Sequence, residues 1–148
     1  MTHKFLLAAA LAAIPLAAVA QGNAAQIGPE QLVAARQSVM ALSGGDLAAM
    51  KAAAEAGGDV KQLVPSARGL ARWGRALPTL FPAGSVGGHA KPEIWSDRPG
   101  FEAAAAAFAD SARLLGEAAA AGDREAFLTR WGEVRGACGA CHEAYKGD

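Results

Sequence analysis

Residues 124–146, REAFLTRWGEVRGACGACHEAYK, decide the fold of this chain of 148 residues. Asp123 stands directly before them as a candidate N-cap, and bulky apolar residues precede the cysteines at helical spacing. The stretch therefore predicts a long amphipathic helix. It also contains Cys138 and Cys141, the two cysteines of the chain, with His142 directly after the second.

The rest of the chain predicts three more helices and no sheet. Alanine is abundant, β-branched residues are sparse and do not alternate with polar ones, and no hairpin dipeptide separates two strand-like runs. We expect the first helix to open at Pro29, to be interrupted at Gly44-Gly45, to resume with Asp46 as a cap and to stop at Gly57.

A long connection separates the second and third helices. Asp59 can cap the second, over 60–77, and Pro65 either kinks this helix or marks its true start. The connection, 78–100, is rich in glycine and proline, and its length in so small a domain predicts a functional or packed, Ω-like segment. The third helix covers 101–121. Four amphipathic helices with short turns predict an all-α, antiparallel four-helix bundle with one long crossover.

The first twenty residues, MTHKFLLAAALAAIPLAAVA, have the pattern of a secretory signal peptide. Their apolar run of about fifteen residues is shorter than the roughly twenty that a membrane-spanning helix needs. We expect cleavage after Ala20 and export to the periplasm, which leaves one domain over 21–148. Without Lys4 the chain has 13 basic and 14 acidic residues. It has no basic stripe for nucleic acid and no polybasic patch for a membrane surface.

Cys138, Cys141 and His142 occupy positions i, i+3 and i+4 of the expected helix, so they share one face. Two thiols and an imidazole at this spacing are typical of covalent haem c attachment, with the imidazole on the iron. A zinc site needs four ligands and could add only His89. A thioredoxin-like pair lacks its βαβ context, and a helix-end disulfide leaves the histidine unexplained. No nucleophile and base remain for an enzyme once that histidine is committed.

Besides His89, two methionines outside the signal peptide, Met40 and Met50, are candidates for the second axial position of the iron. Met40 lies in register with Leu42 and other apolar residues of the first helix. If Met40 binds, the iron is six-coordinate and suited to electron transfer; if it only packs over the iron, the site is five-coordinate and admits a diatomic gas. Phe81 and Trp95, which flank the long connection, are expected haem neighbours.

Four stretches carry a resemblance to a known family. They are RQSVM in the first helix, LPTLFPAGS after the second, GGHAKPEIWSD before the third and GACGACHEAYK at the end. With these stretches the chain resembles the class II c-type cytochromes, and specifically the cytochrome c′ family. The resemblance implies one haem c, held by Cys138 and Cys141, with His142 as the proximal ligand.

The resemblance also implies roles in the first helix. Met40 matches the position above the iron, where cytochrome c′ carries an apolar residue that does not coordinate; low-spin relatives use a methionine from this region as the sixth ligand. Arg36 and Gln37 match a polar pair whose arginine commonly lies near a haem propionate. Lys146 stands where many members have an arginine beside the proximal histidine, so the charge is kept and the planar guanidinium is lost.

Two functions follow from the resemblance. The first is a periplasmic, redox-active haem protein whose five-coordinate iron binds nitric oxide or carbon monoxide. The second is a low-spin electron carrier with His142 and Met40 as axial ligands. Either function implies a redox partner protein, which the sequence does not identify, and the first two helices of such proteins often form a homodimer.

Overall fold

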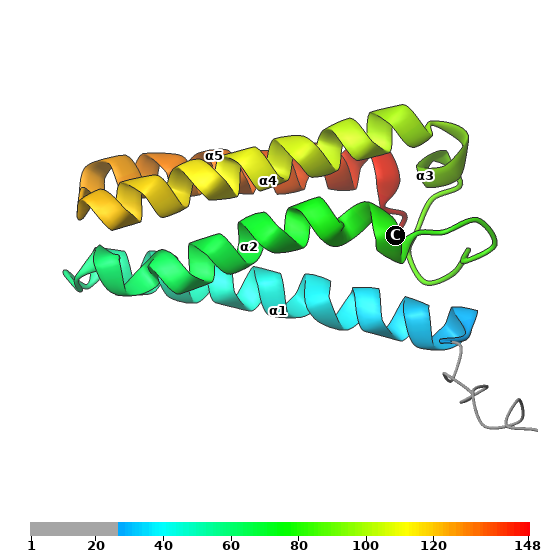
Figure 1. Ribbon diagram of the computed structural model, residues 1–148, viewed down its shortest axis with the longest axis horizontal. Coiled ribbons are helices and arrows are strands. Elements are labelled where there is room, and N and C mark those ends of the chain that lie inside the picture. Colours follow the sequence, from blue (N-terminus) through cyan, green and yellow to red (C-terminus); the bar gives the residue numbers. More distant parts are fainter. Residues whose placement is uncertain (1–26) are drawn as a thin grey trace, which may run out of the picture.

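A computed structural model describes residues 27–148, so the expected signal peptide lies outside the described residues. Four long helices run alternately up and down, which confirms the predicted four-helix bundle (Figure 1). They are α1 (Pro29–Glu55), α2 (Val64–Ala76), α4 (Arg98–Ala121) and α5 (Arg124–Tyr145). The short elements between them are two 3₁₀ turns, η2 (Val60–Leu63) and η3 (Leu77–Leu80), and a one-turn helix, α3 (Glu93–Ser96).

Helix α1 is continuous, so the expected interruption at Gly44-Gly45 was wrong. A glycine inside a helix costs about 1 kcal/mol relative to alanine, but neither of these two adopts a positive φ angle, and the helical hydrogen bonds continue past them. Asp46 is therefore not a cap. Its carboxylate instead accepts a hydrogen bond from Ser66 Oγ of α2 at 3.0 Å, which ties two neighbouring helices together.

The helix ends follow the local capping residues. Pro65 lies in the first turn of α2 and marks its true start, which decides between the two predicted roles of this proline. Asp97 accepts a hydrogen bond from the Gly100 amide at 3.2 Å, so α4 begins three residues before the predicted start. Asp123 caps α5 through the Ala126 amide at 3.0 Å, as predicted.

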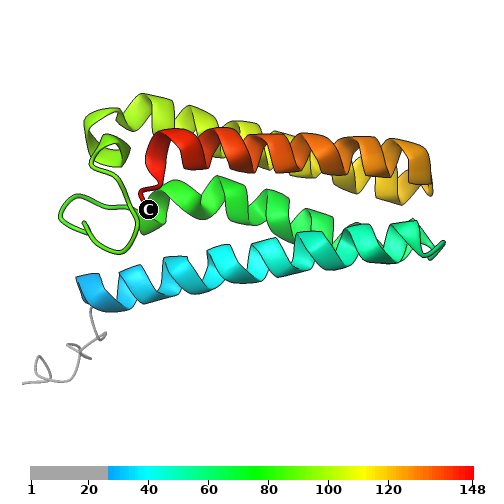
Figure 2. The ribbon, with the colours of Figure 1, turned by 180° about the vertical axis from the view of Figure 1, so that it is seen from behind.

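The bundle has two different ends. The turn end holds the short α1–η2 and α4–α5 turns. The connection end holds the start of α1, the connection between α2 and α4, and the carboxyl terminus (Figures 1 and 2). Helix α4 packs closely on both α2 and α5, and α1 lies against α2 and α5 with fewer contacts. Leu42 of α1 is 71% exposed, so the expected apolar neighbour of Met40 faces away from the core.

Within residues 27–148, no helix combines the length and apolar character that crossing a membrane requires.

Candidate haem site

The predicted attachment residues lie on the last three turns of α5, at the connection end. Cys138 and Cys141 are both free thiols and are partly buried, whereas His142 is exposed. Regular helix geometry from Arg124 to Tyr145 places the three side chains on one face, as the spacing predicted. This face borders two cavities.

The two cavities meet at Met40, Cys141 and His142, which line both of them. The outer cavity has a volume of about 340 Å³ and opens toward the connection. It is further lined by Arg36, Gln37, Phe81, Gly87, His89, Ala90, Ile94, Phe101, Tyr145 and Lys146. The inner cavity, of about 330 Å³, extends between α1 and α5 into the bundle. Cys138 lines only the inner cavity, so the two thiols border the same hollow from successive turns of one helix.

Burial sets the protonation of the three α5 side chains. It raises the pKa of the Cys138 thiol, against an opposing effect of the Arg135 charge. Burial, followed by the nearby Cys138, also raises the pKa of Cys141. Although the His142 residue is exposed, partial desolvation of its ring and then the Lys146 charge lower the pKa of His142. At neutral pH the site therefore holds two protonated thiols and a neutral imidazole with a free lone pair.

Two observations separate the alternatives. A thioredoxin-like pair needs a cysteine with a lowered pKa, whereas burial raises the pKa of both thiols here. A zinc site needs a cluster of ligands. Across the described residues, no three His, Cys, Asp or Glu side chains gather closely enough to hold a metal ion. Two cysteines and a histidine at this spacing, beside an apolar hollow, are instead the groups that covalent haem attachment uses. The residues present therefore fit a haem group.

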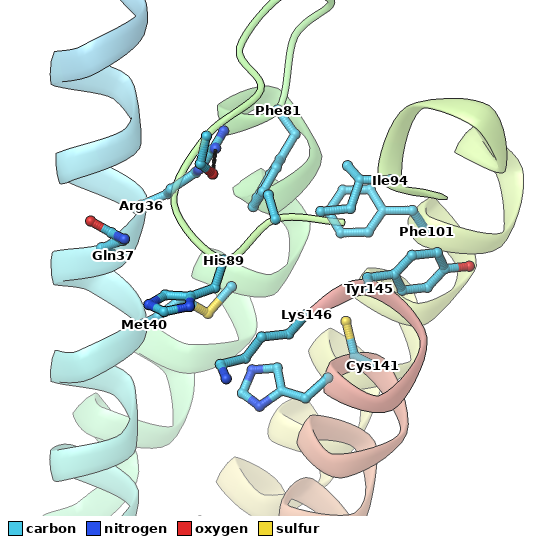
Figure 3. A pocket seen from close by; sticks show the side chains of 13 residues that line it. Arg36, Gln37, Met40, Phe81, His89, Ile94, Phe101, Cys141, Tyr145 and Lys146 are labelled. Atoms are coloured by element: carbon cyan, nitrogen blue, oxygen red, sulfur yellow. Dashed lines mark hydrogen bonds between the residues drawn. The ribbon is translucent and has the colours of Figure 1, made fainter. Parts of the chain in front are cut away.

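Helix α1 supplies the wall opposite α5. Met40 and Gln37 lie on α1, across the outer cavity from Cys141 and Lys146 (Figure 3). Met40 packs against the apolar cluster of the connection end. Met50 is only 1% exposed and belongs to the core cluster, lining neither cavity. Of the two predicted methionine candidates, only Met40 is therefore near the attachment residues.

Arg36 is buried, 3% exposed, and holds the connection against α1. Its Nη1 donates to the Ser85 carbonyl at 2.8 Å and to Ser85 Oγ at 3.3 Å, and its Nη2 donates to the Gly87 carbonyl at 2.7 Å. The guanidinium also lies 4.6 Å from the centre of the Phe81 ring. No described carboxylate is within ion-pair distance of it. It is therefore a buried cation at the cavity wall, not a solvated helix charge.

Gln37, the second member of the polar pair, is exposed and packs against the connection. A β-carbon on Gly88 would lie 2.7 Å from Gln37 Nε2, and Gly88 has a φ angle of 59°. The φ angle favours glycine at this position, because other residues rarely adopt it, and a side chain here would also displace the end of Gln37. The GGH segment of the sequence thus lets the connection pass close to α1.

Phe81 and Trp95 have different positions. Phe81 lines the outer cavity and begins a row of rings, with centroid distances of 5.0 Å to Phe101 and 5.4 Å from Phe101 to Tyr145. Trp95 lines neither cavity. It packs behind Phe81, at 6.3 Å between ring centres, and its Nε1 donates to the Pro82 carbonyl at 2.9 Å. The structure therefore brings Phe81, but not Trp95, to the cavity wall.

The sequence did not indicate how the connection is fastened to the end of α5. The Lys91 amide donates to the Tyr145 carbonyl at 3.0 Å, and the Gly147 amide donates to the His89 carbonyl at 2.8 Å. Lys91 Nζ also donates to the Glu143 carbonyl at 2.8 Å. Almost any residue can form backbone hydrogen bonds of this kind, so the amino-acid sequence does not indicate them. Only the length of the connection pointed to a packed segment.

Tyr145 forms a second tie that sequence reasoning missed. Its hydroxyl donates to Asp97 Oδ2 at 2.9 Å, while Oδ1 of the same carboxylate caps α4 through Gly100. One side chain thus joins the start of α4 to the last turn of α5, beside His142. Tyr145 is 9% exposed and lines the outer cavity.

Comparisons with known proteins agree with this geometry. The family model described as Cytochrome C' matches residues 31–146. A cytochrome c′ of Alcaligenes xylosoxydans is 44% identical over 72 residues, which are 48% of this chain and 57% of that protein; the match thus spans little more than half of the relative. A cytochrome c′ of Allochromatium vinosum is 31% identical over 146 residues, covering 94% of both chains.

Solved structures give the same match. The nitric oxide complex of a single-residue variant of cytochrome c prime from Alcaligenes xylosoxidans superimposes with a TM-score of 0.75 at 33% identity. The match covers 81% of this chain and 96% of that one.

Proposed function

Because this chain belongs to the cytochrome c′ family, we propose that it is a periplasmic protein with one covalently bound haem c, which changes oxidation state and binds nitric oxide or carbon monoxide. The observation that carries this proposal is the position of Cys138, Cys141 and His142 on one helical face, beside two joined cavities. Nitric oxide complexes of relatives support gas binding as the function.

Each residue has a defined task in this proposal. Cys138 and Cys141 hold the haem through two thioether bonds, and His142 supplies the lone pair for the proximal side of the iron. When bound, the haem supplies an iron that exchanges one electron or takes a diatomic ligand. Arg36 offers a buried positive charge that suits a haem propionate, since no described carboxylate neutralises it. Lys146 holds a second positive charge at the outer cavity.

The distal side is controlled by Met40. Its side chain lies between the two cavities, where it covers the space opposite His142. We propose that it packs over the iron without binding, which leaves a five-coordinate site that admits small gases and excludes larger ligands. Met40 also favours a second candidate function, a low-spin electron carrier, because it is the described methionine that faces His142. Ligand binding and electron exchange, and no catalytic turnover, are proposed for either case.

The visible spectrum of the protein, produced with export and haem-maturation machinery and reduced with dithionite, tests the proposal. We expect haem that stays with the denatured chain, a broad unresolved band of high-spin iron, and carbon monoxide binding. Protein without covalent haem would overturn the proposal. Sharp, separated α and β bands would favour the electron carrier.

Two variants of Met40 separate crowding from ligation. Met40→Ala should speed carbon monoxide binding because it opens the distal side, whereas Met40→Leu keeps the bulk and should leave the rate near that of the original protein. In the low-spin alternative, both variants lose the sharp bands. Met50→Leu is the matched control, since it makes the same change on the same helix at a residue that lines neither cavity.

The partners remain proposals as well. A separate redox protein is needed to supply or remove the electron. A homodimer through α1 and α2 is supported by the exposed Leu42 and by the fewer contacts of α1 with the rest of the bundle.

A further inference from the structure

We infer that Ser43 is the polar group of the distal wall, and that its hydroxyl donates a hydrogen bond to the outer atom of an iron-bound diatomic ligand. This hydrogen bond stabilises the ligand more strongly when the outer atom carries more negative charge. This inference rests on the proposed gas-binding function. It concerns the inner cavity, where Ser43 and Met40 stand side by side on α1, opposite His142.

Helix geometry directs Ser43 toward the same space as Met40. The two residues are three positions apart on an unbroken helix, so their side chains point to one face. Both line the inner cavity together with Cys138 and His142 of α5. Ser43 is partly buried, whereas its neighbour Leu42 faces outward. If a haem is bound with His142 on its iron, a small ligand in this cavity would face Met40 and Ser43.

The hydroxyl is the only one among the residues that line the inner cavity. The rest of the α1 wall is apolar or lacks a side chain, with Leu47 and Ala48 on the next turn and Gly44 beside Ser43. Trp131 of α5 has its Nε1 committed to the Leu47 carbonyl at 2.7 Å. Trp73 of α2 and Arg135 of α5 also line the cavity, from outside the α1 wall. The Ser43 hydroxyl is therefore the polar side-chain group that α1 itself offers to this cavity.

The present hydrogen bond of Ser43 can be exchanged at low cost. Its Oγ donates to the Val39 carbonyl, four residues back, at 2.8 Å. In a helix that carbonyl also accepts the backbone amide of the following turn, so it keeps a partner when the hydroxyl turns away. Gly44 leaves open space next to it, since a β-carbon there would meet no atom within 4 Å. The hydroxyl can therefore rotate toward a ligand in the cavity.

Carbon monoxide bound to the ferrous holoprotein is the probe. A hydrogen-bond donor near the outer oxygen increases the negative charge on that atom and weakens the C–O bond. We expect Ser43→Ala to raise the C–O stretching frequency and to speed carbon monoxide dissociation by about two- to tenfold, the factor that one neutral hydrogen bond contributes. Ser43→Thr keeps the hydroxyl and should restore both values.

Ser38→Ala is the matched control. Ser38 lies on the same helix and its Oγ donates to the Ala34 carbonyl at the same 2.8 Å, but it is exposed and lines neither cavity. We expect no change in either value. An unchanged frequency and rate in Ser43→Ala, or an equal change in Ser38→Ala, would overturn the inference while gas binding stands. A protein that forms no carbon monoxide adduct would overturn the proposed function together with this inference.

Discussion

The turn end and the connection end of the bundle are built differently, although α5 runs through both. At the turn end, Phe127 and Val134 of α5 are completely buried, and Leu115 and Ala119 of α4 are as well. At the connection end, the same helix presents partly exposed cysteines and an exposed histidine to two cavities. The turn end fills its own core, and the connection end leaves room for another group.

Polar ties supplement a smaller apolar cluster at the connection end. Arg36 binds two carbonyls of the connection, Lys91 caps the end of α5, and Tyr145 joins α5 to Asp97. Such contacts fix geometry with little apolar burial, and they leave the cavity open. We therefore expect the two ends of the bundle to respond differently to loss of haem, to core truncation and to pH.

Loss of the attachment thiols is expected to have the largest effect. The double variant Cys138→Ser with Cys141→Ser should carry no covalent haem, and hydrogen exchange should then quicken at the last turns of α5 and in the connection. Amides near Phe127 should stay protected, because their burial does not involve the cavities. Equal loss of protection at both ends would contradict the division between them.

Core truncation should reverse this pattern. Phe127→Ala removes a fully buried ring from the turn end and should cost about 3–5 kcal/mol of unfolding free energy, with the haem spectrum unchanged. Phe81→Ala removes a ring that already borders the outer cavity. It should cost less stability and alter the spectrum. Urea unfolding and absorption of the two holoproteins test this pair, and a spectral change in Phe127→Ala would count against it.

The sequence predicted the turn end better than the connection end, for physical reasons. Caps such as Asp123 act through neighbours in the sequence, so they can be recognised without the fold. The Gly44-Gly45 break failed because each glycine costs only about 1 kcal/mol relative to alanine in a helix, and the helix of 27 residues continues past both.

Residue spacing alone was enough to place Cys138, Cys141 and His142 on one helical face, as the structure has them; their role in haem attachment stays a prediction. The partners of Arg36 were not predictable, because they are backbone carbonyls 49 and 51 positions away in the chain. Ser43 had a weak signal, since it follows Met40 by three positions on the same helix. Trp95 flanks the connection as Phe81 does, and only the folded path of the chain places one ring at the cavity and the other behind it.

The smallest predicted effect is a dependence of stability on alkaline pH, which arises at the connection end from Tyr145. Burial raises the pKa of the Tyr145 hydroxyl, and so do its hydrogen bond to Asp97 and the charge of that carboxylate. The pKa of the Tyr145 hydroxyl is thus higher in the folded protein than in the unfolded chain, where the pKa of tyrosine is about 10. The stabilisation is complete below that pH and is lost as the pH rises toward the folded pKa.

Tyr145→Phe should therefore show a weaker loss of stability between about pH 8 and about pH 11 than the original protein, because the titrating group is gone. Lysines also titrate in this range, but they are common to both proteins and cancel in the difference. Asp97→Asn keeps a side chain that caps helices well and removes the charge, so it should give an intermediate slope. Urea unfolding at both pH values measures the difference, and parallel pH profiles for all three proteins would show that the tie between α4 and α5 does not depend on this proton.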